Sequence, residues 1–487
     1  MLHFRCSKSA IGLVFITFLS FKSDDEFIEP FKKINDEVLK NSKAYETLNE
    51  ASVTIGHRLT GSTNGAKAEQ YAFNLLKKYG YDVKFQPLEV EAWQRDTVTL
   101  DIVPDKSDNF HDVPVVALAQ SPVQATVKGS IVDVGNGLEE DFEAMKEEVK
   151  GKIAMVNIGL IAPKQGQKNL HRSEKTALAI KYGATAIITI NQVAGNILLT
   201  GTASVTGGLI AIPAVNIAKE SGDEIRNWIK VDKKLNGIIE MRNIVKKVKV
   251  RNVIATLKGK SSEKIIVGGH LDSWDLATGS MDNGLGSFGI MDIARTFKSL
   301  KIKPKRTIEF VLFTGEEQGL LGSRFHVKEL IRTKQIDKVR FMMNLDMTNA
   351  VYGMSVGGRD ELLPYFQGIG EQIKKIDEKY SNTTASRAGL HSDHQPYMLE
   401  GVPTGAPMGR LSAQALGCYH ANCDRMDIIQ KDQMTDAVRF SAMLLYGLAN
   451  SKEIPAKRLD NLKTRDYLIA QGLKQELVIG RDWKWVD

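Results

Sequence analysis

Residues 264–275 read KIIVGGHLDSWD, and this stretch decides the fold class because it joins a buried strand to polar side chains. The run from Ile265 to Val267 is short, apolar and β-branched, which is typical of a strand buried inside a sheet. His270 follows just past its C-terminal end, where open α/β sheets place their ligands. The stretch therefore predicts an α/β fold with a site at one edge of the sheet.

Two further apolar runs repeat this arrangement along the chain. TIEFVLF is followed by Glu316 and Glu317, and VRFMMNL is followed by Asp346. Both runs are typical of buried strands. Because ligands of open α/β sheets gather outside the carboxyl ends of the strands, we expect these acidic side chains to lie near His270.

The remaining candidates stand in two polar motifs. Asp282 lies in GSMDNGLG, whose glycines allow a sharp turn into an apolar helix predicted at about residues 287–300. His420 lies in CYHANCD. Another polar motif contains His394 and Tyr397, and only its family resemblance implies that it lines the substrate side; Tyr397 or Tyr419 either steadies an oxyanion or only packs.

These side chains have the chemistry of a site for two zinc ions. Histidine nitrogens and carboxylate oxygens suit zinc, and five side chains suffice for two ions when one carboxylate bridges them. The predicted ligands are His270, Asp282, Glu317, Asp346 and His420. Glu316 is then free to act as a general base. Each residue alone has a structural alternative, such as a helix N-cap at Asp346, but their joint occurrence after three strands favours the metal site.

The motifs GGHLDSWD, MDNG, TGEEQG, NLDMT and YHANCD carry a family resemblance. Residues 270–424 resemble the dinuclear zinc exopeptidases, a family that includes carboxypeptidase Q and aminopeptidase Y. The motif GGHLDSWD, with its tryptophan, is most similar to carboxypeptidase Q. The resemblance implies a three-layer catalytic domain, with a mixed, mostly parallel central sheet flanked by helices. It also implies two Zn²⁺ ions per chain and a peptide substrate.

The same resemblance assigns the ligands to individual ions. It gives His270 and Asp346 to one zinc, Glu317 and His420 to the other, and makes Asp282 the bridge. Glu316 matches the general base that takes a proton from the attacking water.

Supporting residues are implied in the same way. Asp272 matches a carboxylate that holds the imidazole of His270, and Asp424 matches one that holds His420. A cis peptide is implied between Asp282 and Asn283.

The chain also divides by composition. Residues 110–248 contain valine- and isoleucine-rich strands around a helix at 173–182, and resemble the protease-associated domain inserted in relatives. We expect this insert to cap the active site, restrict substrate length or serve structure alone. Residues 24–109 and 249–487 are predicted to form the discontinuous catalytic domain. The tail from residue 451 either packs as a final helix or serves an interface.

The N-terminus predicts export. A basic start precedes an apolar run that is too short to span a bilayer, so residues 1–23 are predicted to be a secretory signal, with an uncleaved anchor as the alternative. The expected location is extracellular, periplasmic or a vesicle lumen. No other segment is apolar and long enough to span a membrane. After the signal only Cys418 and Cys423 remain, either as a disulfide or as two thiols.

Charge and composition narrow the function classes. The chain has 487 residues, 43% hydrophobic content and a formal charge of +7, which is enough apolar sequence for a large core but no nucleic-acid signature. We expect an exported exopeptidase for dipeptides or short peptides. An aminopeptidase of the same fold is the first alternative, and a non-catalytic binding protein is the second. Homodimerisation is expected from the resemblance.

Overall fold

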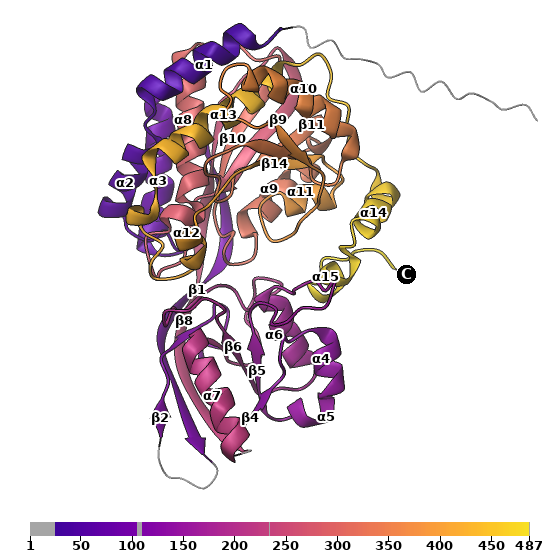
Figure 1. The fold of residues 1–487 in the computed structure, drawn as a ribbon. Helices are drawn as coiled ribbons and strands as arrows, with labels where there is room; N and C mark the ends of the chain where they lie inside the picture. Colours follow the sequence, from indigo (N-terminus) through magenta and orange to yellow (C-terminus); the bar gives the residue numbers. More distant parts are fainter. Residues whose placement is uncertain (1–24, 105–109, 233, 487) are drawn as a thin grey trace, which may run out of the picture.

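The computed structural model describes residues 25–104, 110–232 and 234–486, which form two lobes joined by two long strands (Figure 1). The long strands β1 (Asp82–Pro104) and β8 (Leu235–Leu257) pair antiparallel over their whole length and run through both lobes. The predicted signal at residues 1–23 lies outside the described residues. Within the described part, no helix combines the length and the apolar character that crossing a lipid bilayer requires.

The catalytic lobe is built on a mixed sheet with strand order β13-β12-β14-β11-β9-β10-β8. The pairs β10/β9, β9/β11 and β11/β14 are parallel, which brings their carboxyl ends to one edge. The strand bounds are β9 (Ser261–His270), β10 (Arg306–Phe313), β11 (Val339–Asn344), β12 (Gly353–Ser355), β13 (Thr383–Ala385) and β14 (Thr404–Met408).

Helices cover both faces of this sheet, because alternate residues of each strand point to opposite sides. Ile265 and Val267 of β9 belong to the core under one helical layer, whereas Ile266 between them belongs to the core on the other side. The first layer holds α1 (Ile28–Asn41), α2 (Ala44–Thr54), α3 (Thr63–Lys78), α8 (Leu285–Ser299), α10 (Leu363–Lys374) and α13 (Lys431–Asn450). The second layer holds α9 (Leu321–Arg332) and α11 (Gln395–Leu399).

The sequence-based fold class is confirmed by this architecture. The three apolar runs that were predicted to be buried strands are β9, β10 and β11, and the helix predicted at about 287–300 is α8. A large apolar side chain that is fully buried stabilises the fold by about 1.5–3 kcal/mol. Phe288, Ile293 and Phe297 of α8 are at most 1% exposed, so this helix is held on the sheet by its apolar face.

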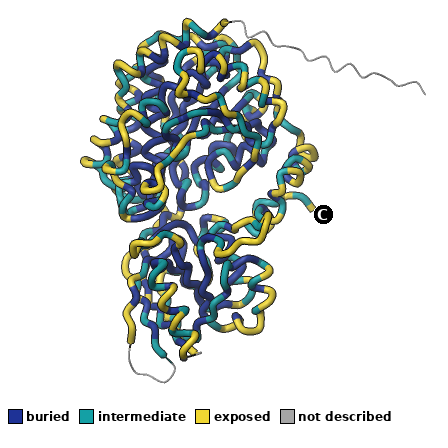
Figure 2. The backbone as a smooth tube through the Cα atoms, in the orientation of Figure 1, coloured by how far each residue is buried: buried dark blue, intermediate teal, exposed yellow. Residues whose placement is uncertain are grey.

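The second lobe has its own buried core (Figure 2), and its strands continue the sheet beyond β8. From β8 the strand order is β4-β5-β6-β7-β3, with β4 to β7 parallel. Its elements are β2 (His111–Asp112), β3 (Val115–Ala117), β4 (Gln124–Asp133), α4 (Glu139–Ala144), α5 (Lys146–Val149), β5 (Ile153–Asn157), α6 (Arg172–Lys181), β6 (Ala186–Ile190), β7 (Ala214–Ile217) and α7 (Lys219–Asp232). The predicted domain boundary at residue 248 falls inside β8, a strand that belongs to both lobes. The limits of the two domains therefore stay a prediction.

The tail, which the sequence left undecided, forms two short helices. These are α14 (Asn461–Ala470) and α15 (Lys474–Ile479), coloured yellow in Figure 1. Leu468, Leu473 and Leu477 pack with residues of the catalytic lobe, and Ile479 packs against the core of the second lobe. The tail therefore spans from one lobe to the other.

Candidate metal centre

The predicted ligands come together at the carboxyl edge of the catalytic sheet. His270 is the last residue of β9, where it lies beside Phe313 at the end of β10, so the turn carrying Glu316 and Glu317 begins next to it. Asp346 stands just after β11. Asp282 lies in η1 (Ser280–Gly284), the irregular turn that starts α8.

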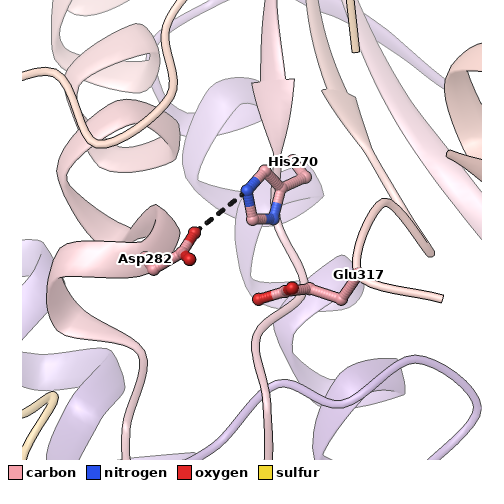
Figure 3. Close-up of side chains that lie close together, drawn as sticks. All are labelled: His270, Asp282 and Glu317. Carbon is pink, nitrogen blue, oxygen red and sulfur yellow. Dashed lines mark ion pairs between the residues drawn. The ribbon is translucent and has the colours of Figure 1, made fainter. Parts of the chain in front are cut away.

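The two carboxylate oxygens of Asp282 face two different histidines. Oδ1 lies 3.2 Å from His270 Nε2, and Oδ2 lies 3.0 Å from His420 Nε2. His270 Nε2 also lies 3.4 Å from Asp346 Oδ1, and His420 Nε2 lies 3.1 Å from Glu317 Oε2. Figure 3 shows His270, Asp282 and Glu317 converging.

These separations match a metal site. Two ligand atoms bound about 2.1 Å from one tetrahedral zinc ion are roughly 3.4 Å apart. The observed distances fall into two groups that share Asp282, as expected when one carboxylate bridges two ions. Glu317 Oε1 and Asp346 Oδ1 are also buried, and no described residue gives either oxygen a hydrogen bond. Unpaired buried carboxylate oxygens are costly, and a bound cation would satisfy them, so the residues fit zinc.

Backbone contacts hold the ligands in place. Asp424 accepts hydrogen bonds from the backbone N–H groups of Met281, at 2.7 Å, and Asp282, at 3.0 Å. Ser392 Oγ donates to Asp346 Oδ2 over 2.6 Å. The cis peptide between Asp282 and Asn283 that the resemblance implied is present.

Asp272 and Asp424 make contacts that differ from the expected ones. The carboxylate of Asp272 lies 3.8 Å from His270 Nδ1, whereas the backbone oxygen of Asp272 lies 3.1 Å from it. The carboxylate instead accepts from the backbone N–H groups of Glu316, at 3.2 Å, and Glu317, at 3.3 Å. Both aspartates therefore fix turns that carry carboxylates, because those turns leave backbone donors without carbonyl partners.

Burial dominates the electrostatics of the site. Burial raises the pKa of Glu316, and the nearby carboxylates of Glu317 and Asp346 raise it further, whereas the charge of His270 lowers it. Burial likewise raises the pKa of Glu317. Burial alone would lower the pKa of His270, but the charges of Glu316 and Asp346 raise it well above its usual range. The centre thus concentrates negative charge away from water, which favours a cation.

A cavity opens over the centre, and its walls come from three parts of the chain. Glu316 and the ligands form its floor, α6 of the second lobe forms one wall, and the tail forms another. The sequence suggested that the insert caps the active site, but it did not identify which residues of the second lobe line the cavity. Arg172, the first residue of α6, lines the cavity, and its Nη2 lies 2.8 Å from His420 Nδ1. The start of α6 carries a capping box, a sequence pattern that marks where a helix begins. The pattern does not show which part of the molecule the helix start faces.

The second lobe is docked onto the GGHLDSWD motif itself. The carboxylate of Asp275 accepts hydrogen bonds from Nε and Nη2 of Arg95 in β1. Arg95 also donates to the backbone oxygen of Ala117 and to Thr200 Oγ1. The backbone oxygen of Thr200 lies 3.3 Å from His420 Nδ1, so the same docking places the second lobe against a candidate ligand.

The other candidates have separate roles. His394 Nε2 lies 3.0 Å from the backbone oxygen of Gly389, and His394 does not line the cavity. Tyr397 is buried against His326, away from the cavity, whereas the Tyr419 ring lines the cavity and stacks on His420. Cys418 and Cys423 form a disulfide on either side of His420.

Comparisons with known proteins agree with this geometry. Residues 252–445 match the model of peptidase family M28, and residues 113–225 match the PA domain. These two matches identify a peptidase family M28 domain in residues 252–445 and a PA domain in the second lobe. The protein is a zinc metallopeptidase that acts on peptides.

Relatives from both branches of exopeptidase activity are similar over most of their length. The chain is 26% identical to "Aminopeptidase YwaD" of Bacillus subtilis, over 89% of this chain and 90% of that one. It is 25% identical to "Carboxypeptidase Q" of Homo sapiens, over 85% and 86%. The fold matches the crystal structure of a peptidase M28 precursor from Shewanella amazonensis with a TM-score of 0.74 and 24% identity, covering 90% and 100%.

Proposed function

We propose that this peptidase is exported, binds two zinc ions and cleaves free dipeptides or short peptides as a carboxypeptidase or dipeptidase. The observation that carries the two-metal proposal is the position of Asp282, whose two oxygens face His270 and His420 separately. A single metal site would need only one of these oxygens.

The proposed ligand assignment follows the two groups of short distances. His270 and Asp346 would hold one ion, and Glu317 and His420 would hold the other, with Asp282 between them. Asp272 and Asp424 act as positioning residues, because they fix the turns that carry Glu317 and Asp282.

The catalytic step is assigned to Glu316. A zinc pair, when bound, would activate water and polarise the peptide carbonyl. Glu316 lines the same cavity and its carboxylate is not needed as a ligand. It accepts the proton of the attacking water and returns that proton to the leaving amine. Asp272 keeps Glu316 in place by accepting its backbone N–H.

Arg172 supports recognition of a substrate carboxylate. A histidine that binds metal through Nε2 carries its proton on Nδ1. In His420, the Nδ1 proton can be donated to the backbone oxygen of Thr200. The guanidinium of Arg172 can only donate hydrogen bonds, so a protonated Nδ1 offers it no acceptor. Arg172 Nε is also buried without a partner. A guanidinium that lines a substrate cavity with free donors suits the C-terminal carboxylate of a peptide.

An aminopeptidase is the second candidate, favoured by the similarity to YwaD. The two candidates differ in the substrate end that they require. A carboxypeptidase or dipeptidase loses activity when the C-terminal carboxylate is converted to an amide. An aminopeptidase cleaves such amides but loses activity when the N-terminal amine is blocked.

Export and assembly complete the proposal. The disulfide between Cys418 and Cys423 supports an oxidising compartment, as predicted from the N-terminal 23 residues. N-terminal sequencing of material released by the source cells should begin near residue 24; recovery of a cytoplasmic chain starting at Met1 would contradict export. We also propose a homodimer, on the resemblance alone, and light scattering of the purified chain tests it.

The decisive experiment combines metal content with substrate blocking. We expect two zinc ions per chain by elemental mass spectrometry, and cleavage of a free dipeptide that a chelator abolishes and zinc restores. The corresponding dipeptide amide should be a poor substrate. Faster cleavage of the amide would move the function to aminopeptidase, and no chelator-sensitive cleavage of any peptide would contradict the enzymatic proposal.

A further inference from the structure

A pair of glutamates that are not candidate metal ligands lines the same cavity. Glu174 comes from the start of α6 in the second lobe, and Glu476 comes from α15 in the tail. Both line the cavity that contains Glu316. Neither residue is explained by the proposed chemistry, because the zinc ligands and the general base all lie in the catalytic lobe.

Glu174 is a buried carboxylate with one unpartnered oxygen. The residue is 1% exposed. Its Oε2 accepts the backbone N–H of His171 over 2.7 Å and caps α6. Among the described residues its Oε1 has no hydrogen-bond partner, and His391 Nε2 lies 3.6 Å from it. A buried carboxylate oxygen without a partner, in a residue that lines a cavity, is costly unless a ligand supplies a donor.

Glu476 adds a second negative charge beside Glu174. Burial raises the pKa of Glu476, and the charge of Glu174 raises it further, whereas Lys168, His391 and Arg387 oppose this. Lys168 Nζ lies 3.9 Å from Glu476 Oε1, too far for a hydrogen bond, and instead donates to the backbone oxygen of Gly472. The surrounding basic groups therefore leave both carboxylates without a direct charged hydrogen bond.

The tail holds Glu476 in this position. Asp482, just beyond α15, accepts two hydrogen bonds of 2.7 Å from the guanidinium of Arg324 in α9. It also accepts one from Gln395. Leu477 is 1% exposed, and Ile479 packs against the second lobe. Like charges are thus kept close together by packing, which is a preorganised arrangement for a cation.

We propose that Glu174 and Glu476 bind a cationic group of the peptide substrate. The inference rests on the proposed function and deepens it, because it adds a charge preference to the same cavity. The cation is an ammonium or guanidinium, which donates several hydrogen bonds to carboxylates. It comes either from the free N-terminal amine or from a lysine or arginine side chain. Arg172, two residues before Glu174, would take the carboxylate of the same substrate.

Conservative variants separate this role from a structural one. E174Q keeps an oxygen that can cap α6, and E476Q keeps the size of the side chain, so both should fold. The double variant E174Q/E476Q removes the negative charge. E147Q, an exposed glutamate on the second lobe that does not line the cavity, is the matched control. Melting temperature and zinc content of each variant report whether the fold and the metal centre survive.

Two pairs of substrates identify the source of the cation. One pair is a dipeptide with a C-terminal lysine and its norleucine analogue, which lacks only the charge. The other is a dipeptide with a free amine and its N-acetylated form. In the pair that supplies the cation, we expect the wild-type ratio of kcat/KM between cationic and neutral substrates to fall about 10- to 100-fold in the double variant. The E147Q ratio should match the wild type.

The outcomes also separate this inference from the proposed function. A double variant that keeps both ratios, or loses kcat/KM equally for every substrate, overturns the cation site even when the enzyme is an active exopeptidase. If the wild type cleaves no peptide, the proposed function fails, and calorimetry decides the site alone. Purified wild type should then bind L-lysine more tightly than the double variant does, whichever of the two lysine amines supplies the cation; equal binding of L-lysine by wild type and double variant overturns the inference.

Discussion

The carboxyl edge of the catalytic sheet and the start of α6 in the second lobe meet in one cavity, but they are built differently. The catalytic edge presents His270 from the end of β9, Asp282 from the turn that starts α8 and Glu317 from the turn after β10. The start of α6 presents Arg172 and Glu174, which reach the cavity only because the second lobe docks against the GGHLDSWD motif. Local strand geometry therefore places the candidate metal ligands, whereas domain docking places the residues that we propose select the substrate.

Removing the proposed bridging carboxylate of Asp282 should have the largest effect on zinc content and activity. D282A leaves both groups of ligands one oxygen short, so we expect loss of zinc and activity near the uncatalysed background. Elemental analysis and dipeptide hydrolysis measure this. D223A, on the exposed surface of α7, is the control. A D282A variant that retains two zinc ions would remove the reason for treating the catalytic edge as a shared metal site.

Removing the proposed base should separate chemistry from metal binding. E316Q keeps the shape of the side chain and no ligand atom is lost, so zinc content should stay at the wild-type value. We expect kcat to fall about 10²–10⁴-fold, the usual contribution of a positioned general base. E329Q on the surface of α9 should behave as wild type. Turnover of E316Q close to that of the wild type would show that another group accepts the proton.

The second lobe should show a pH dependence of its own. Lys175 in α6 donates to the backbone oxygens of Asn157 and Ile158, and burial lowers its pKa to about 7. The unfolded chain binds this proton up to about pH 10.4, so the free energy of unfolding should rise between about pH 7 and 10.4, by roughly 3–5 kcal/mol.

Calorimetry of the full chain across this pH range measures the rise. K175M cannot titrate at this position and should show a flatter dependence, whatever its absolute stability. Parallel curves for wild type and K175M would mean that Lys175 titrates in the folded state as it does in water.

Changing Arg172 should alter specificity and leave the metals in place. R172M removes the guanidinium, and we expect kcat/KM for a free dipeptide to fall about 10- to 100-fold relative to the dipeptide amide. R226M, in the same lobe but paired with Asp133 away from the cavity, is the control. An unchanged ratio would make the second lobe a structural cover with no part in recognising the carboxylate.

The disulfide at the junction of the two regions should have the smallest effect. It closes a short loop around His420, so the double variant C418S/C423S should lose about 2 kcal/mol or less of unfolding free energy. Chemical denaturation measures this, and reduced wild type should match the variant. Loss of bound zinc with little loss of unfolding free energy would show that the loop mainly positions His420.

The sequence predicted the catalytic edge well because its information is local. A buried β-branched run followed by a histidine or a carboxylate identifies a strand and the residue at its end, as at His270 and Asp346. The resemblance, and not the strand order, assigned the ligands to two groups. Their roles as zinc ligands stay a proposal until metal is measured.

The cavity walls could not be predicted in the same way. Arg172 and His420 are separated by 248 positions in the sequence, and their contact depends on how two domains pack. The contacts of Asp272 depend on packing in the same way. The resemblance implied a contact between its carboxylate and His270, and in the structure that carboxylate also accepts the backbone N–H groups of Glu316 and Glu317, which come from another strand end.

The central claim is that Asp282 bridges two zinc ions, and anomalous scattering at the zinc edge from crystals of the zinc-loaded protein tests it most directly. The account predicts two peaks, one on each side of the Asp282 carboxylate, the first beside His270 and Asp346 and the second beside Glu317 and His420. A single peak, or two peaks of which one lies away from Asp282, would contradict it.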